Sequence, residues 1–197
     1  MNSAEWGGQL AGNGRTAAGP ELFDVLDENG HKTGKTKERS QVHRDGDWHR
    51  AVNIWVINDH DEVLLQKRAA HKDSWPGYWD ISAGGHIVAG EDSLTAALQE
   101  LYEELGLVVR PGELEYLGSW KSSTRPAPNF INNSFNDLYF LRTSKTVNEL
   151  VLQDTEVSEA KFIPLDELKK LLENPQGDAM RLVSHSWAYR RLLEVVG

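Results

Sequence analysis

The chain has 197 residues, of which 39% are hydrophobic and 26% charged, as in an ordinary globular protein with one folded domain. The net charge of −9 argues against a protein whose main ligand is a nucleic-acid backbone, and the absence of cysteine excludes disulfides and thiolate chemistry. No apolar run approaches the length of a membrane span, and the N-terminus lacks the basic start and apolar centre of a signal peptide. We therefore expect a cytoplasmic protein without membrane or nucleic-acid partners, either a monomer or a homodimer.

The first part of the chain is predicted to be a tail followed by short strands. Residues 1–20 are rich in Gly, Ala, Asn and Ser without periodicity, which predicts a disordered tail. A single domain is expected over residues 21–197. It begins with a short strand at residues 21–26, a turn at residues 28–30, and a second short strand or loop that ends at Thr36.

Residues 41–50 are polar and rich in turn formers, so a loop is expected there. This segment carries two histidines, His43 and His49. An isolated histidine is more often hydrogen-bonded or at the surface than bound to a metal. The nearby carboxylates of Asp45 and Asp47 raise the metal option only modestly.

Two apolar runs at residues 51–57 and 63–66 flank a polar Asn-Asp-His-Asp turn, which predicts a hairpin of core strands. The second half is expected to hold strands at residues 114–120, 130–143 and 157–163, a polar loop at residues 121–129, and helices at residues 164–173 and 178–195. The apolar face of the last helix is expected to include Leu182 and Tyr189. Strands with interspersed helices, without repeats or linkers, predict one α/β domain with a mixed sheet.

Three basic residues, Lys67, Arg68 and Lys72, lie just before an aromatic turn that contains Trp75 and Trp79. Such a cluster is either a solvated basic loop or a clamp for a diphosphate, because Arg forks and Lys charges suit phosphate oxygens. We favour the clamp because a candidate metal site follows closely in the sequence. The two tryptophans are more often core residues than ligand contacts, but both are candidates for a substrate pocket.

The stretch from residue 85 to residue 107, GHIVAGEDSLTAALQELYEELGL, ends in the pattern of an amphipathic helix. Asp92 or Ser93 can cap the start of this helix, and Gly106 can end it. One apolar stripe recurs at spacings of three and four residues and consists of Leu94, Ala97, Leu98, Leu101 and Leu105.

Three glutamates of this helix, Glu100, Glu103 and Glu104, lie three and four residues apart, so their carboxylates converge on one face. Crowded like charges destabilise a helix, and a bound divalent cation would remove that cost. Oxygen ligands suit a hard ion such as Mg²⁺ or Mn²⁺. Taken alone, the pattern is more often a solvated acidic face. The preceding Gly84 and Gly85 allow the backbone to approach a ligand or an ion closely.

The spacing favours the metal site, because this stretch resembles the Nudix box, G-x5-E-x7-R-E-U-x-E-E-x-G-U with U aliphatic. The positions in register are Gly85, Glu91, Glu100, Leu101, Glu103, Glu104, Gly106 and Leu107. The departure is Gln99, where the family has an arginine that holds a helix glutamate by a charged contact. Gln99 can donate hydrogen bonds but carries no charge, which leaves room for a weaker or differently tuned catalyst.

The resemblance covers about residues 21–175 and implies an α/β/α sandwich around a mixed sheet. It also implies an enzyme in which water attacks a diphosphate linked to another group, with Mg²⁺ or Mn²⁺ as cofactor. On this chain the implied metal ligands are Glu100, Glu103, Glu104 and the backbone carbonyl at Gly85. One of these glutamates, or a later acidic residue, would orient the water.

A closer resemblance is to the Nudix subgroup related to type I isopentenyl-diphosphate isomerase and to plant Nudix hydrolases with an isomerase-like domain. It rests on four segments, VHRDGDWHRA, QKRAAHKDSWPGYWD, SAGGH and FINNSFND. This resemblance implies a second metal set of His43, His49 and His86. It also implies that Arg68 and Lys72 hold the substrate diphosphate.

The same resemblance argues against isomerase chemistry. The isomerases need a cysteine at the position that Gly84 takes here, and carboxylates on the later strand, where residues 132–137 contain only Asp137. The isomerases have a degraded box, whereas this chain keeps the box glutamates. The chemistry that the resemblance implies is therefore that of the hydrolase.

We expect a metal-dependent hydrolase of an organic diphosphate, with isopentenyl or dimethylallyl diphosphate as the sharpest guess. Nucleotide substrates such as ADP-ribose, NADH or a nucleoside triphosphate stay open, since the tryptophans can stack a base or line a prenyl pocket. Two further hypotheses are isopentenyl-diphosphate isomerase activity and a non-catalytic diphosphate-binding module.

Overall fold

A computed structural model describes residues 19–174 and 180–197 of the chain. The tail predicted at residues 1–20 lies outside the described residues except for its last two positions, as does the start of the helix predicted from residue 178. None of the described helices is long and apolar enough to cross a membrane.

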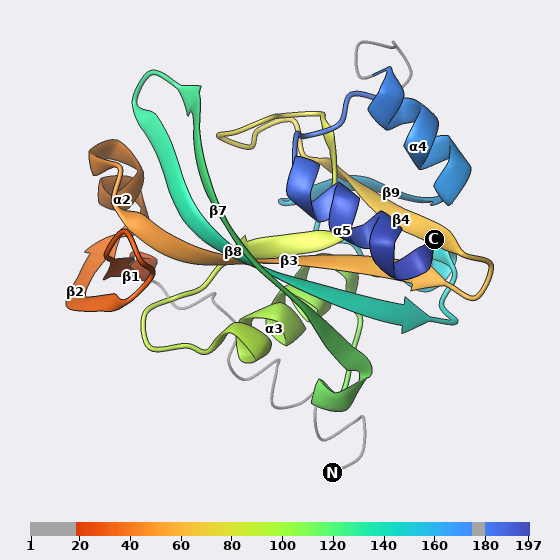
Figure 1. Ribbon diagram of the computed structural model, residues 1–197, viewed down its shortest axis with the longest axis horizontal. Coiled ribbons are helices and arrows are strands. Elements are labelled where there is room, and N and C mark those ends of the chain that lie inside the picture. Colours follow the sequence, from red (N-terminus) through yellow and green to blue (C-terminus); the bar gives the residue numbers. More distant parts are fainter. Residues whose placement is uncertain (1–18, 175–179) are drawn as a thin grey trace.

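The sheet is built around β3 (Trp48–Asn58), whose Val, Ile and Trp residues favour a strand. β3 pairs in parallel with β8 (Phe130–Thr143) along its whole length and antiparallel with β6 (Ala83–His86). It also pairs with β4 (Glu62–Arg68) across the predicted polar turn. The hairpin and the strand at residues 130–143 are therefore confirmed (Figure 1).

Nine strands of the described residues form one mixed sheet, in which β4 pairs with β5 and β9, β3 with β1, β1 with β2, and β8 with β7. The remaining strands are β1 (Leu22–Leu26), β2 (Lys32–Glu38), β5 (Trp79–Asp80), β7 (Leu114–Ala127) and β9 (Val157–Pro164). The helices are α2 (Arg39–Asp45), α3 (Ser93–Leu105), α4 (Leu165–Glu173) and α5 (Ser186–Val196), with short 3-10 turns at Pro111–Glu113 and Val147–Glu149.

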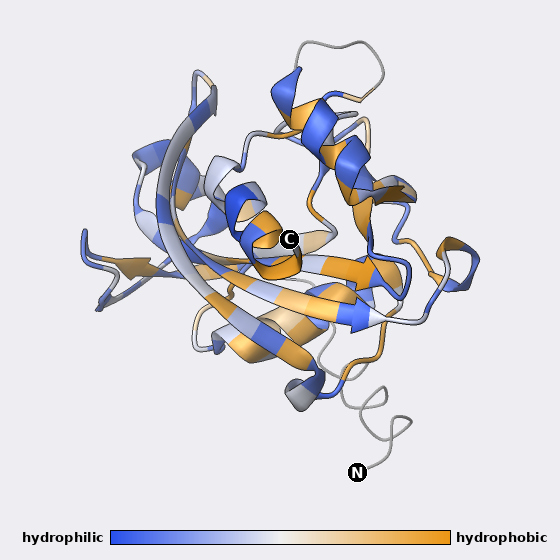
Figure 2. Ribbon diagram, turned by 45° about the vertical axis from the view of Figure 1, so that its right-hand side comes forward, coloured by the Kyte–Doolittle hydropathy of each residue, from blue (hydrophilic) through white to orange (hydrophobic). Residues whose placement is uncertain are grey.

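The alternation of side chains along β3 produces two hydrophobic layers. Ile54 and Val56 pack with the apolar stripe of α3, whereas Trp55 and Ile57 pack on the other face with residues of α4 and α5. Figure 1 shows α3 on one side of the sheet and α4 and α5 on the other, and Figure 2 shows α4 and α5 with one hydrophobic and one hydrophilic side. The structure thus confirms the predicted α/β/α sandwich.

Helix α3 begins and ends where its capping residues predict. The Asp92 side chain accepts a hydrogen bond from the backbone nitrogen of Thr95 at 3.0 Å. Gly106 ends the helix in the left-handed conformation, with a φ of 68° that favours glycine. Between these caps, Leu101 and Leu105 are fully buried, so the helix is held rigidly against the sheet.

Three sequence predictions about local structure are wrong. Residues 41–50 are not a loop, because α2 (Arg39–Asp45) buries Val42 and His43 before β3 starts at Trp48. Residues 121–129 are not a loop either, because β8 supplies hydrogen bonds that extend β7 to Ala127. β7 has no other partner among the described strands, so an edge position accommodates Pro126.

The final helix starts later than residue 178. Residues 180–185 form no helix, and Leu182 bridges to Trp79 of β5 instead of lying on a helix face. The backbone nitrogen of Trp79 donates to Arg181 at 2.8 Å, and that of Val183 donates to Trp79 at 2.8 Å. These hydrogen bonds provide partners for backbone polar groups of the segment, so it needs no helix to pair them.

Candidate active site

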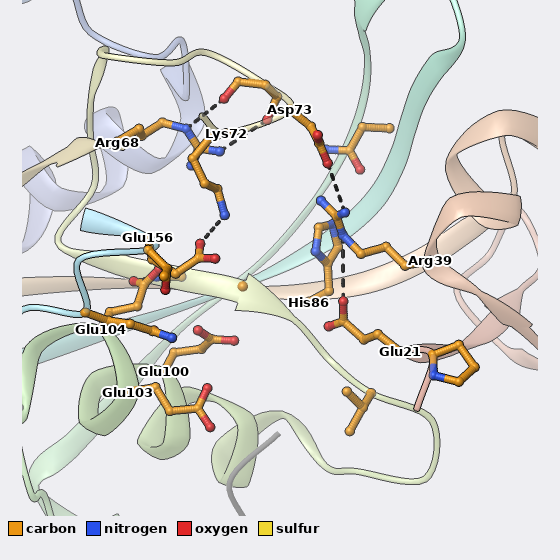
Figure 3. A pocket seen from close by; sticks show the side chains of 18 of the residues that line it. Glu21, Arg39, Arg68, Lys72, Asp73, His86, Glu100, Glu103, Glu104 and Glu156 are labelled. Carbon is orange, nitrogen blue, oxygen red and sulfur yellow. Dashed lines mark hydrogen bonds and ion pairs between the residues drawn. The ribbon is translucent and has the colours of Figure 1, made fainter. Parts of the chain in front are cut away.

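A cavity of about 870 Å³ opens between α3, strand β6, the loop after β4 and helix α2. Figure 3 shows Glu100, Glu103 and Glu104 on one wall, with Lys72 and Glu156 facing them. The cavity therefore brings the predicted acidic set and two predicted basic residues, Arg68 and Lys72, to the same place from segments far apart in the sequence.

The three glutamates come from successive turns of α3, and two of them are buried. Glu100 and Glu104 are each 5% exposed, whereas Glu103 is partly buried. Glu104 Oε2 accepts hydrogen bonds from the backbone nitrogen of Gly84 at 3.0 Å and from Gln66 Nε2 at 3.1 Å. Burial, together with the nearby Glu100 and Glu156 carboxylates, raises the pKa of Glu104 well above its usual value.

Gly85 is the point at which strand β6 touches the acidic helix. A Cβ atom placed on Gly85 would lie 2.0 Å from Glu100 Oε1, so only glycine leaves room for that carboxylate. The neighbouring Gly84 is also confined, since its Cβ would lie 2.7 Å from the backbone oxygen of Val52. Crowded buried carboxylates beside an open backbone are a donor set that fits a hard divalent cation.

The predicted basic residues are placed differently from one another. Lys72 lines the cavity and forms an ion pair with Glu156. Arg68 also lines it, but its guanidinium is bound to Ser74 and Asp80. Lys67 lies outside the cavity and pairs with Glu159 at 3.5 Å on the neighbouring strand β9, because successive strand residues point to opposite faces.

Comparison with known proteins agrees with this geometry, since the model of the NUDIX domain family matches residues 47–183. The chain belongs to the Nudix family. Nudix hydrolase 3 of Arabidopsis thaliana is 44% identical over 156 residues, which are 77% of this chain but only 20% of that relative. An uncharacterized Nudix hydrolase of Listeria monocytogenes is 34% identical over 152 residues, 77% of this chain and 84% of the relative.

An isopentenyl-diphosphate Delta-isomerase of Streptomyces griseus is 30% identical over 148 residues, 75% of this chain and 73% of that enzyme. Among solved structures, the crystal structure of DR0079 from Deinococcus radiodurans matches with a TM-score of 0.66 at 21% identity, over 88% of this chain and 98% of that chain. These matches confirm the Nudix fold and the subgroup. The matching Nudix family model and the relatives named Nudix hydrolase support a hydrolase that acts on diphosphate bonds.

Gln99, the departure from the Nudix box, keeps a contact to a box glutamate. Its Nε2 donates to Glu103 Oε1 at 2.8 Å, and the residue is only 2% exposed. The amide thus orients Glu103 through a hydrogen bond from a neutral donor, where a guanidinium would provide a charged fork.

A second cavity, of about 520 Å³, adjoins the first along β6 and is shared with it at Gly84, Gly85 and His86. Its aromatic walls include Trp75 and a stacked pair, Trp120 and Trp187, whose ring centroids are 4.8 Å apart. Trp75 is therefore placed at a pocket, as the substrate hypothesis requires. Trp79 is not, because it is 7% exposed, packs in the core beneath α5, and lines neither cavity.

The three histidines of the second predicted set lie together, and His86 lines the first cavity. His43, His49 and His86 each offer a ring nitrogen, and these atoms lie within 4.8 Å of one another. His43 Nδ1 donates to the Arg39 carbonyl at 2.8 Å and His49 Nδ1 to the Asp47 carbonyl at 3.1 Å, which leaves both Nε2 lone pairs unused.

The surroundings of these histidines keep them neutral. Burial, aided by the nearby His49 charge, lowers the pKa of His43 to about 4, and burial lowers the pKa of His49 and His86 as well. Both Nε2 atoms are buried without a hydrogen-bond partner in the described part of the chain, as is Oδ1 of the neighbouring Asn132. Converging unprotonated donors of this kind fit a transition metal.

Several site residues gave no signal in the sequence. Arg39 lines the first cavity from α2 and pairs with Asp73 at 3.1 Å, and Glu156 reaches the cavity from the loop before β9. Asp137, the one acidic residue among residues 132–137, is bound by Arg50 at 3.0 and 3.1 Å. Lone residues on loops carry no periodic pattern, so only the folded chain identifies them.

Proposed function

We propose that this Nudix domain hydrolyses the diphosphate linkage of an organic diphosphate with Mg²⁺ or Mn²⁺ bound by Glu100, Glu103, Glu104 and the backbone carbonyl at Gly85. One observation carries the proposal: Glu100, Glu103 and Glu104 line the same cavity beside β6, where Gly85 leaves room for the buried Glu100 carboxylate and the Gly84 backbone nitrogen donates to the buried Glu104. A binding module has less need of such a set, since uncompensated buried carboxylates are destabilising.

The residues around the cavity have complementary tasks in this reaction. Glu100, Glu103 and Glu104 would hold a divalent ion, which would supply a lowered pKa for the attacking water and positive charge near the leaving phosphate. Lys72 and Arg39 face the same space and supply positive charge for the phosphate oxygens. Glu156, which pairs with Lys72 beside Glu104, is the later acidic residue that orients the water.

Isopentenyl and dimethylallyl diphosphate are the first substrate candidates, with the prenyl group in the second cavity against Trp75, Trp120 and Trp187. The similarity to an isopentenyl-diphosphate Delta-isomerase supports this choice. A nucleotide such as ADP-ribose is the second candidate, because a cavity of about 520 Å³ with stacked tryptophans also suits a base.

Isomerisation is not part of the proposal, since Gly84 offers no thiol and Asp137 is engaged in an ion pair with Arg50. The cytoplasmic location, the choice between Mg²⁺ and Mn²⁺, and the oligomeric state also stay predictions of the sequence.

The test is phosphate and pyrophosphate release from a panel of isopentenyl diphosphate, dimethylallyl diphosphate, ADP-ribose, NADH and nucleoside triphosphates with Mg²⁺ or Mn²⁺, with product masses recorded. Release of a prenyl monophosphate would support the first candidate, and activity on nucleotides alone would favour the second. Interconversion of the two prenyl isomers would contradict the argument from Gly84. No release from any compound would leave a diphosphate-binding module.

Lys72→Ala tests the basic side of the site. We expect KM for the preferred diphosphate to rise about tenfold while kcat falls less than about threefold, as for a contact made equally in the ground and transition states. Steady-state kinetics separate the two constants. Lys67→Ala is the matched control, since Lys67 lies outside both cavities, and an unchanged KM in Lys72→Ala would contradict the clamp.

We also propose that His43, His49 and His86 hold a second, nitrogen-ligated metal. Co²⁺ added to the metal-free protein is expected to give visible absorption bands that require these histidines. His43→Gln should remove the bands, whereas His60→Gln, at an exposed turn, should keep them. Bands that persist in a folded His43→Gln protein would contradict this assignment.

A further inference from the structure

A chain of hydrogen-bonded side chains connects the C-terminal segment to the loop that carries Lys72. His185 Nε2 lies 2.8 Å from Asp80 Oδ1, and Arg68 Nη1 donates to Asp80 Oδ2 at 3.1 Å. Arg68 Nε and Nη2 then donate to Ser74 at 3.0 and 3.2 Å. His185 lines the second cavity and Lys72 the first, while Arg68 and Ser74 line both.

The central residues of this series of hydrogen bonds are charged and largely buried. The side chains of Asp80, Arg68 and His185 are 9%, 19% and 24% exposed. Burial alone would raise the pKa of Asp80, but His185, Arg68 and the Ile81 backbone nitrogen together lower it to about 2. Asp80 is therefore ionised and accepts only, so His185 Nε2 carries the hydrogen and donates it. Charged hydrogen bonds at such depth hold geometry more firmly than surface ion pairs do.

Arg68 contacts the loop after β4 beside a residue with a left-handed backbone. Trp75 has a φ of 52°, a left-handed conformation that costs an L-residue about 1–2 kcal/mol. Arg68 binds the neighbouring residue, Ser74, by donating hydrogen bonds to its backbone oxygen and to its hydroxyl. Lys72 lies two residues before Ser74, so a shift of the Arg68 guanidinium would shift the ammonium group.

We propose that His185 is a positioning residue that, through Asp80 and Arg68, fixes the loop bearing Lys72 and so sets how tightly the site holds a diphosphate. This inference rests on the proposed function, because it takes Lys72 as a phosphate contact. It assigns to the segment before α5 a role in the reaction other than forming a pocket wall.

The test is a double-mutant cycle between His185→Phe and Lys72→Ala, with magnesium methylenediphosphonate as a non-hydrolysable probe and calorimetry to measure Kd. Distant residues with independent roles have additive effects. We expect His185→Phe to weaken binding about tenfold in the wild-type background, about 1.4 kcal/mol, and less than about twofold in Lys72→Ala. His185→Gln, whose amide can still donate to Asp80, should restore most of the affinity.

His60→Phe, at an exposed turn, is the matched control, and melting temperatures identify variants that fail to fold. If His185→Phe does not fold, Asp80→Asn replaces it with the same expected dependence on Lys72. An equal loss in both backgrounds, or no loss in either, would overturn the inference even if the panel diphosphates are hydrolysed. Coupled binding without turnover of any diphosphate would instead overturn the proposed function alone.

Discussion

Glu104→Gln is expected to abolish measurable turnover of the preferred diphosphate, with kcat at least about 10³-fold below wild type. Glu104 is tightly held, since it is 5% exposed and accepts hydrogen bonds from the Gly84 backbone nitrogen and the Gln66 side chain. An amide gives the metal one neutral oxygen in place of a carboxylate. Each tenfold decrease in rate corresponds to about 1.36 kcal/mol of activation free energy. The expected decrease therefore corresponds to a loss of about 4 kcal/mol of electrostatic stabilisation of the transition state.

The same substitution is expected to leave the fold intact. Without a metal, Glu104 is buried beside Glu100 and Glu156, so replacing it with a neutral side chain relieves like-charge repulsion. The Gln oxygen can still accept from the Gly84 backbone nitrogen. We therefore expect the metal-free variant to melt at or above the temperature of the metal-free wild type.

Glu115→Gln, an exposed position on β7 far from the acidic helix in sequence, is the matched control and should retain full activity. Steady-state kinetics with saturating Mg²⁺, together with thermal melting of the metal-free proteins, check both halves of the prediction. Wild-type rates in Glu104→Gln would rule out its role as a metal ligand.

Gly85→Ala should lower activity by about 100-fold or more with a much smaller effect on stability. The added Cβ would lie 2.0 Å from Glu100 Oε1, a distance that no real contact allows. The Glu100 carboxylate is the end of a flexible side chain, so it can move aside while β6 stays paired with β3. Its displacement would misplace a metal ligand, which costs about 3 kcal/mol of the activation barrier per 100-fold.

Gly112→Ala provides the comparison, since a Cβ there meets nothing within 4 Å. It should keep wild-type kcat and a wild-type melting temperature. The informative measurement is kcat against Mg²⁺ concentration for both variants. If Gly85→Ala behaves like Gly112→Ala, then the close approach of Glu100 to β6 plays no part in catalysis.

The sequence alone predicted the parts of the fold whose signals are local. The stripe of α3, its cap at Asp92 and its end at Gly106 are periodic or positional signals within a few residues of one another. The hairpin of β3 and β4 and the strand β8 follow from continuous apolar runs. The spacing of the box glutamates likewise placed them on one helix face before any tertiary contact was known.

Tertiary packing determined the secondary structure of those segments whose sequence pattern is weak. Helix α2 forms in a polar segment because Val42 and His43 become buried against neighbouring elements. β7 continues past its apolar part because β8 offers backbone partners. Residues 180–185 are not helical, because Trp79 supplies backbone hydrogen-bond partners to Arg181 and Val183 that a helix would otherwise provide.

For the site, the sequence determined the chemistry of the acidic helix, and the tertiary structure decided what faces it. In the sequence, Lys67, Arg68 and Lys72 are equivalent members of a basic cluster. In the structure, Lys67 points away from the cavity because side chains alternate along a strand, and Arg68 is bound to Ser74 and Asp80 and so holds the loop. Glu156 and His185 reach the cavities only through folding. Such long-range placements depend on which buried charges find partners, and that depends on the whole chain at once.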